Sequence, residues 1–141
     1  MKYVIDSSVA VKWVITEPYS DRADLLRADF QNAVHELLSP DIFPVEVAHA
    51  LTRAERQGRV PAGKSNVLLG DVLSTTPRLH PSFPFLYRAV QISSQMKIGM
   101  YDCLYVALAE HENCELITAD DRLIKNLLNY FPFIISLASI S

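Results

Sequence analysis

Short apolar runs alternate with segments of helical periodicity along the whole sequence, and this alternation limits the fold more than any other feature. Residues 2–5, 115–119 and 133–137 are apolar runs of strand length, and a weaker run covers 36–39 before Pro40. Strands that alternate with helices pair in parallel, and a parallel sheet needs both of its faces covered. We therefore expect an α/β fold with a central, mainly parallel sheet.

Helices are expected in the intervals between these strands. Residues 42–57 place their apolar side chains on one face, and Gly58 ends this helix. Residues 101–112 are nearly all apolar, which indicates a well-buried helix. The same patterns predict further helices over 7–14, 20–31, 62–74 and 83–96, and one more that begins at 120. Pro77 and Pro81 separate the helix over 62–74 from the helix over 83–96.

The composition is that of one ordinary domain. The chain has 141 residues, 50% of them hydrophobic, and a net charge of −3. No repeat or linker divides it, so we expect a single domain over residues 1–141. No apolar stretch approaches the ~18–20 residues that cross a bilayer, and Asp6 interrupts any signal-peptide core. Cys103 and Cys114 form neither a disulfide framework nor a zinc motif, so a cytoplasmic protein is expected.

Four acidic residues stand where the expected elements meet. Asp6 and Asp120 each follow a strand, so both point to the carboxyl edge of the sheet, where such folds bind ligands. Asp102 begins the buried helix and is costly there without a cation or hydrogen bonds. Glu46 lies at the border between the apolar and polar faces of its helix. We expect the four to converge on one edge.

Each acid also has a purely structural interpretation. Asp6 and Asp120 suit helix N-caps, Asp102 can complement a helix dipole, and Glu46 can be a solvated helix residue. The combination of the four acids favours a shared functional site over four separate structural roles. Two carboxylates ~4 Å apart repel by roughly 4 kcal/mol at an effective dielectric near 20, so a convergent set needs a divalent cation or raised pKa values. Oxygen ligands suit Mg²⁺ or Mn²⁺, which can activate water against a phosphodiester.

Several basic residues are candidates for contacts with a nucleic-acid backbone, although exposed basic side chains often serve only solubility. These candidates are Arg53, Arg56, Arg59, Lys64, Lys97 and Arg122. The four histidines share no motif, and no catalytic role is assigned to them.

Four spaced motifs resemble the PIN-domain family, and among its branches the VapC-type toxins. The resemblance covers essentially the whole chain in the family's order. The motifs are Val4-Ile5-Asp6-Ser7-Ser8-Val9-Ala10-Val11-Lys12-Trp13, Pro44-Val45-Glu46-Val47-Ala48-His49-Ala50-Leu51, Tyr101-Asp102-Cys103-Leu104-Tyr105-Val106-Ala107-Leu108-Ala109 and Leu116-Ile117-Thr118-Ala119-Asp120.

This resemblance implies a three-layer α/β/α domain that cleaves RNA endonucleolytically with Mg²⁺ or Mn²⁺. It assigns the acidic catalytic and metal-binding set to Asp6, Glu46, Asp102 and Asp120, and supporting hydroxyls to Ser8 and Thr118. Asp6 and Asp102 are the expected direct metal ligands, while Glu46 and Asp120 act through water or on a second metal. Cys103 replaces an alanine that is common in the family, and both residues fit a buried helix.

The resemblance also implies partners. Members of this branch commonly form homodimers and are neutralised by a small antitoxin whose tail occupies an apolar groove. Such a groove can be lined by Trp13, Val14 and the apolar positions of residues 62–73. These side chains can instead belong to the core. Two alternatives stay open: a stand-alone nuclease of RNA processing and a non-catalytic RNA-binding module. A phosphotransferase of the haloacid-dehalogenase type is disfavoured, because Ser8 stands where that family has a second aspartate.

Overall fold

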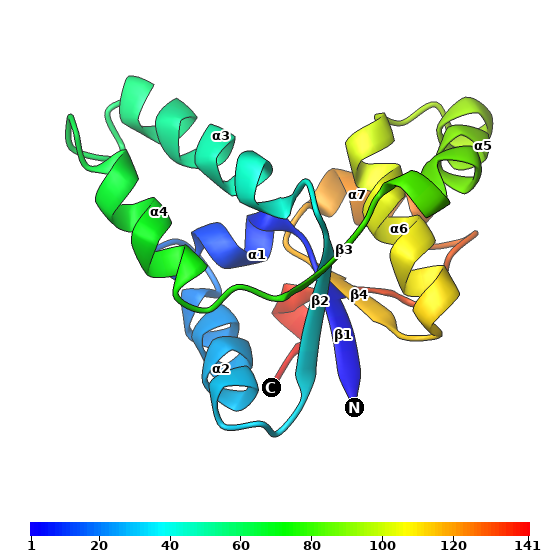
Figure 1. The fold of residues 1–141 in the computed structure, drawn as a ribbon, viewed down its shortest axis with the longest axis horizontal. Helices are drawn as coiled ribbons and strands as arrows, with labels where there is room; N and C mark the ends of the chain where they lie inside the picture. The colour runs from blue at the N-terminus through cyan, green and yellow to red at the C-terminus, as the bar shows by residue number, and fades with distance from the viewer.

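The protein is built on a five-stranded parallel sheet, described by a computed structural model of residues 1–141 (Figure 1). The strand order is β3-β2-β1-β4-β5, and every neighbouring pair is parallel. The strands are β1 (Lys2–Ile5), β2 (Glu36–Pro40), β3 (Arg78–His80), β4 (Glu115–Thr118) and β5 (Ile134–Ser136). The expected parallel sheet is confirmed, with no antiparallel strand in it.

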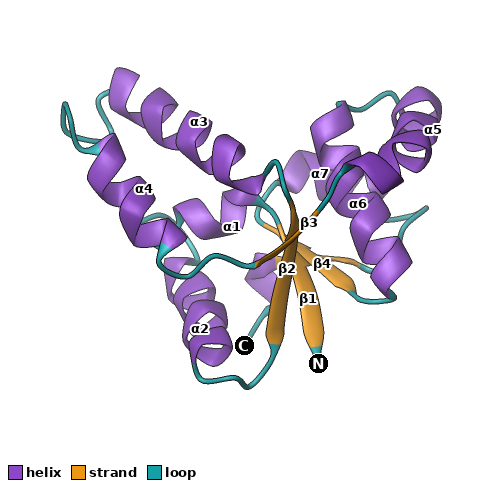
Figure 2. Cartoon of the chain, viewed as in Figure 1, coloured by secondary structure: helices purple, strands orange, loops and turns teal.

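Helices cover both faces of this sheet (Figure 2). One group consists of α1 (Ser7–Val11), α2 (Ser20–Gln31), α3 (Phe43–Arg56) and α4 (Ser65–Leu73). The other consists of α5 (Leu86–Met96), α6 (Met100–Glu112) and α7 (Asp121–Leu127), with 3₁₀ turns at Phe83–Phe85 and Leu137–Ser139. The two groups lie on opposite sides of the strands, which confirms three layers (Figure 1). No helix is both long enough and apolar enough to span a bilayer.

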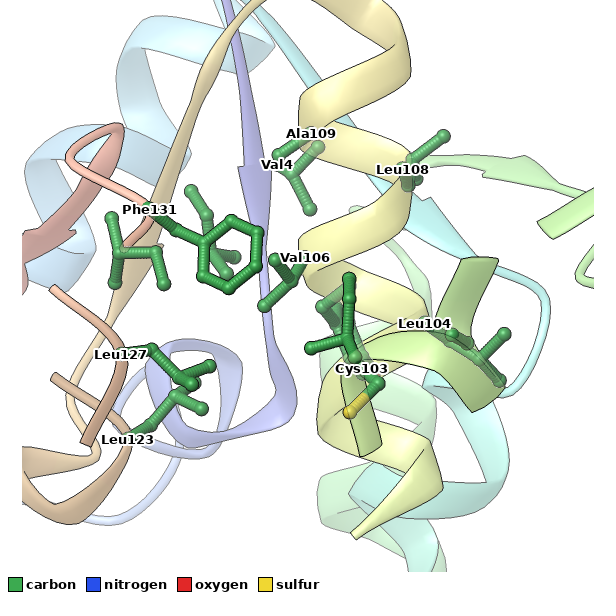
Figure 3. Close-up of a cluster of buried hydrophobic side chains, with 14 of the residues drawn as sticks. Val4, Cys103, Leu104, Val106, Leu108, Ala109, Leu123, Leu127 and Phe131 are labelled. Atoms are coloured by element: carbon green, nitrogen blue, oxygen red, sulfur yellow. The ribbon is translucent and has the colours of Figure 1, made fainter. Parts of the chain in front are cut away.

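Alternating strand residues build a separate core on each face. Val4, Leu38 and Leu116 pack with the apolar side of α6 and α7 (Figure 3), whereas their neighbours Ile5 and Ile117 pack with α1 to α4. This period of two is what a strand imposes on a sheet with both faces buried. Because α6 packs between α5 and the sheet, almost its entire circumference is apolar.

The structure adds one strand that was not expected and changes two helix boundaries. β3 occupies the segment between Pro77 and Pro81 that was expected to be only a connection. It is a three-residue strand at the sheet edge, where flanking prolines are tolerated and little apolar patterning is needed. α1 ends at Val11 rather than at residue 14, and α4 begins at Ser65 rather than at 62, after a turn in which Gly63 has a φ of +80°.

Trp13 belongs to the core rather than to a surface groove. Its side chain is buried, and its indole N–H donates to the carbonyl of Ala23 at 2.9 Å. The guanidinium of Arg27 lies 4.9 Å from the ring centroid. Trp13 therefore joins α1 to α2, and it is not available to line an apolar groove.

Candidate active site

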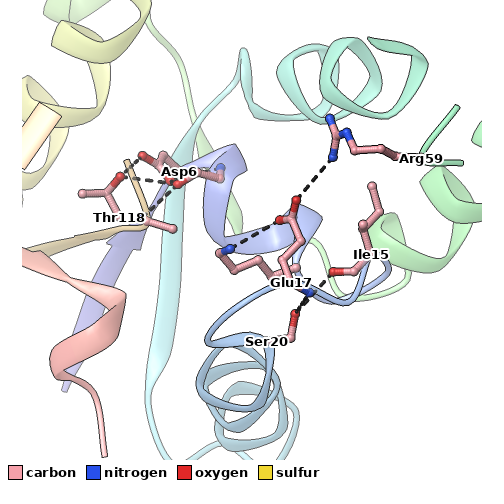
Figure 4. A network of polar contacts seen from close by, with 9 residues as sticks. Asp6, Ile15, Glu17, Ser20, Arg59 and Thr118 are labelled. Atoms are coloured by element: carbon pink, nitrogen blue, oxygen red, sulfur yellow. Dashed lines mark hydrogen bonds and ion pairs between the residues drawn. The ribbon is translucent and has the colours of Figure 1, made fainter. Parts of the chain in front are cut away.

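Asp6 lies at the centre of the carboxyl edge of the sheet. It directly follows β1 and caps α1, and its side chain is only 6% exposed. One carboxylate oxygen accepts hydrogen bonds from the Ser8 backbone N–H at 3.1 Å and from the Ser8 hydroxyl. The other accepts one from the Thr118 hydroxyl, since Ile5 pairs with Ile117 and the residues that follow these two strands emerge side by side (Figure 4).

The Ser8 and Thr118 hydroxyls also join the two strand-to-helix turns. The Ser8 oxygen accepts from the Ala119 N–H at 2.9 Å, and the Thr118 oxygen accepts from the Asp120 N–H at 3.0 Å. Each hydroxyl thus donates to Asp6 and accepts from the turn after β4. This reciprocal bonding fixes the Asp6 carboxylate against the start of α7.

The other three acids lie at the starts of three helices. Asp120 caps α7 by accepting from the N–H groups of Arg122 and Leu123 at 3.0 and 3.3 Å. Asp102 lies in the first turn of α6 and Glu46 in the first turn of α3, and both are half-buried. Asp6 and Asp120 therefore do serve as caps, yet their positions also bring them together with the other two acids.

The electrostatics show that these carboxylates lie within each other's fields. Burial raises the pKa of Asp6 to about 7, and the negative charges of Asp102 and Asp120 add to this rise, against the hydrogen bonds from the hydroxyls. Burial also raises the pKa of Asp102, with a contribution from Asp120 that Arg122 opposes. The pKa of Glu46 is raised by burial and by Asp102. None of the four acids forms an ion pair with a basic side chain.

Tyr105 is part of this site, although the sequence pattern offers no reason to include it. Its side chain on α6 is buried, and its hydroxyl makes no hydrogen bond within the chain. Burial and the nearby charge of Glu46 raise its pKa, so the phenol stays protonated. The hydroxyl faces the Glu46 carboxylate, because Tyr105 lowers the pKa of Glu46 against the effect of burial.

The donor set fits a hard divalent cation whose coordination is completed from outside the protein. Carboxylate and hydroxyl oxygens are the ligands that Mg²⁺ and Mn²⁺ prefer. No three His, Cys, Asp or Glu side chains are close enough together to enclose an ion by themselves. Mg²⁺ commonly binds through one or two carboxylates and retains several waters, so a loosely gathered set suits it. Asp6 and Asp102 are buried or half-buried without an ion pair, so a bound cation would balance their negative charge.

Two polar clefts open on either side of the acids. The larger, of about 510 Å³, is lined by Ser8 and Glu46 together with Lys12, His49, Arg53 and Arg59. The smaller, of about 240 Å³, is lined by Asp102 and Asp120 together with Lys97, Arg122 and Asn126. Of the basic residues expected to contact nucleic acid, Arg53, Arg59, Lys97 and Arg122 therefore flank the acids. Arg56 and Lys64 are exposed and line neither cleft.

Comparison with known proteins identifies the family of this chain. The family model described as PIN domain matches residues 3–126, so the chain belongs to the PIN-domain family. "Ribonuclease VapC12" of Mycobacterium tuberculosis is 35% identical over 120 residues, which cover 85% of this chain and 88% of that protein. "Ribonuclease VapC3" of Pyrobaculum aerophilum is 26% identical over 138 residues, 96% of this chain and 99% of that protein. The expected similarity to the VapC branch is confirmed.

Solved structures show the same fold at lower sequence identity. The crystal structure of PAE2754 from Pyrobaculum aerophilum has a TM-score of 0.70 and 22% identity, and the match covers 99% of this chain and 94% of that one. VapBC2 from Rickettsia felis, bound to a DNA fragment from its promoter, has a TM-score of 0.62 and 19% identity. That match covers 96% of this chain and 97% of the other.

Proposed function

We propose that this chain is a divalent-metal-dependent endoribonuclease and the toxin of a toxin–antitoxin pair. The observation that carries the proposal is the mutual electrostatic influence of Asp6, Asp102 and Asp120, and of Asp102 and Glu46, at one edge of the sheet where no basic side chain pairs with them. The ribonuclease names of the relatives and the VapBC2 assembly of a structural neighbour support it.

In this proposal, Asp6 and Asp102 bind Mg²⁺ or Mn²⁺ directly, and Glu46 and Asp120 bind it through water or hold a second ion. A bound divalent cation supplies Lewis acidity at the scissile phosphate and lowers the pKa of water. Ser8 and Thr118 keep the Asp6 carboxylate in one orientation through their hydrogen bonds. A fixed ligand orientation matters because small displacements at a reacting centre lower rates steeply.

The clefts give the substrate a path across the acids. A strand whose scissile phosphate lies over the carboxylates can place neighbouring phosphates near Arg53 on one side and near Lys97 and Arg122 on the other. Contacts of this kind supply affinity independent of base sequence and hold the reacting phosphate in register. Arg56, which lines neither cleft, is a less suitable contact.

The nuclease proposal is tested with purified protein, Mn²⁺ and a structured RNA. Wild-type protein should cut the RNA, and Asp102→Asn should abolish cutting and Mn²⁺ binding by isothermal titration. Asp24→Asn on the exposed side of α2 is the matched control and should behave as wild type. Full activity in Asp102→Asn would refute the metal assignment, and RNA binding without any turnover would favour a non-catalytic binding module.

The toxin role is tested in cells. Induced expression should stop growth, and co-expression of a small partner encoded beside the gene should restore it. Harmless expression of an enzyme that is active in vitro would favour a stand-alone RNA-processing nuclease. The reduced cysteines Cys103 and Cys114 and an RNA substrate are consistent with the proposed cytoplasmic location.

A homodimer is also proposed, and the outer face of the α5 region supports it. Phe83, Tyr87 and Val90 follow helical spacing and are 82%, 92% and 52% exposed. Such a run of exposed large apolar side chains is typical of an interaction surface. Light scattering should give twice the 15.9 kDa chain mass, and Tyr87→Glu should reduce it to the monomer.

A further inference from the structure

An internal ion bridge crosses the cleft that opens from the acids along α1 and α3. The Glu17 carboxylate accepts from the Lys12 ammonium at 3.3 Å with one oxygen, and from the Arg59 guanidinium at 3.3 Å with the other. These three residues line the same cleft of about 510 Å³ as Glu46 and Ser8. Figure 4 shows Glu17 and Arg59 on one side of α1, with Asp6 and Thr118 on the other.

Each member of the bridge is also held by its own segment. Gln57 accepts from Arg59 Nε and Nη2 at 3.2 and 3.0 Å, which leaves Nη1 for Glu17. The Lys12 side chain is only 12% exposed. The turn that carries Glu17 is fixed by Ser20, whose hydroxyl accepts from the Glu17 N–H at 3.0 Å. The Arg59 guanidinium therefore stays in place if the carboxylate turns away, and the burial of the Lys12 side chain limits the movement of its ammonium group.

A carboxylate between two cations is a substitute for a phosphodiester in charge and shape. The two non-bridging oxygens of a phosphodiester can each accept from one of these cations, as the two oxygens of Glu17 do. Guanidinium and ammonium groups are the usual protein partners of phosphate. The Glu17 side chain is 31% exposed, so an anion entering the cleft can reach both cations, and in replacing Glu17 it keeps the largely buried Lys12 ammonium paired.

We propose that Lys12 and Arg59 bind a backbone phosphate of the RNA next to the one that is cleaved, and that Glu17 masks this subsite in the free protein. The proposal rests on the ribonuclease function proposed above. Glu17 then differs from the acids at the sheet edge, because Glu17 lowers the affinity for RNA and those acids support cleavage. Only an anion that reaches both cations displaces it.

The test measures binding of a short fluorescein-labelled single-stranded RNA in EDTA, so that no cleavage occurs. Glu17→Gln keeps the size of the side chain and removes its charge. We expect affinity to rise about fivefold at ~0.1 M salt, because RNA must displace the Glu17 carboxylate from both cations in the wild-type protein and no charged side chain competes in the variant. The slope of log K against log salt should stay close to that of wild type, because the same phosphate contact forms in both proteins.

Glu36→Gln is the matched control for the change in net charge. Glu36 is 53% exposed and pairs with Arg78 at 3.4 Å, at the opposite edge of the sheet from the acids. Its replacement likewise frees one arginine, but away from the cleft, and should leave RNA affinity within twofold of wild type. In a second arm, Arg59→Met should cancel the gain of Glu17→Gln, because the freed cation is then missing.

Cleavage with Mn²⁺ completes the test. Glu17→Gln should lower KM without changing kcat, whereas a purely structural role of the bridge would lower the melting temperature and leave KM unchanged. If the variant cuts RNA but binds it no more tightly than Glu36→Gln, the masked subsite is refuted while the nuclease proposal stands. If wild-type protein neither binds nor cuts RNA, the proposed function fails and this subsite fails with it.

Discussion

Replacing Asp6 by asparagine should stabilise the metal-free protein at neutral pH. The folded chain holds Asp6 at a pKa of about 7, against 3.8 for an ordinary aspartate. Between these values the unfolded chain has lost this proton and the folded chain retains it, so stability falls as pH rises through this interval. Over three pH units, at ~1.36 kcal/mol per unit, the loss is on the order of 4 kcal/mol.

The Asp6→Asn substitution removes this pH dependence because an amide does not ionise. The geometry of an asparagine side chain is compatible with the site, since the Ser8 groups can still donate to an oxygen and the Thr118 hydroxyl can accept from the amide. The variant should therefore match wild type near pH 4 and exceed it increasingly up to pH 7. Part of the gain at neutral pH comes from relieved repulsion with Asp102 and Asp120.

Urea unfolding in EDTA across this pH range measures the difference. Asp24→Asn, on the exposed side of α2, should follow the wild-type curve throughout. Adding Mn²⁺ should stabilise wild type, most strongly at high pH because binding displaces protons, and should stabilise Asp6→Asn far less. Equal stability of Asp6→Asn and wild type at pH 8 without metal would show that the folded chain does not raise the pKa of Asp6.

Three further predictions concern the support of the site, the substrate path and the core. Thr118→Val removes the hydrogen bond to Asp6 and should reduce the initial rate of RNA cleavage about 10- to 100-fold, whereas an unchanged rate would show that this hydroxyl does not orient the acid. Arg122→Met should weaken RNA binding and flatten its salt dependence by ~0.7–0.9, while Lys125→Met, whose residue is exposed on the same helix, should change neither; equal effects would contradict a local contact. Leu108→Ala, at a fully buried position of α6, should lower the free energy of unfolding by about 2–5 kcal/mol in urea titrations, and a loss below ~1 kcal/mol would contradict the packing described.

The layered fold could be predicted because its physical cause is visible in the sequence. A strand buried on both faces needs a continuous apolar run, and residues 2–5 and 115–118 show one. β3 could not be predicted in the same way. It has three residues, of which only Leu79 is apolar, and it exists because β2 offers it an edge to pair with.

The end of α1 depends on tertiary contacts that the pattern of apolar residues in the sequence does not reveal. The apolar spacing of α1 continues through Val14, but the chain leaves the helix after Val11. The indole of Trp13 then bonds to a carbonyl on α2, a contact between residues ten positions apart. Tertiary packing thus overrides the local helical pattern here.

The acidic cluster was predictable in part for topological reasons. Parallel strands that are neighbours end at the same edge, so Asp6 and the turn after Thr118 must lie close together. Tyr105 and the Glu17 bridge were not predictable. A tyrosine in an apolar helix indicates core packing, and Glu17 meets Arg59 only because α3 folds back over α1.

Asp6, Glu46, Asp102 and Asp120 are proposed to form one divalent-metal site. Crystals soaked in MnCl₂ and measured at the manganese absorption edge test it directly. An anomalous peak within ligand distance of Asp6 and Asp102 is the predicted result, with the peak lost in Asp102→Asn crystals. Manganese bound only elsewhere on the protein, or absent from this pocket at saturating concentration, would contradict the account.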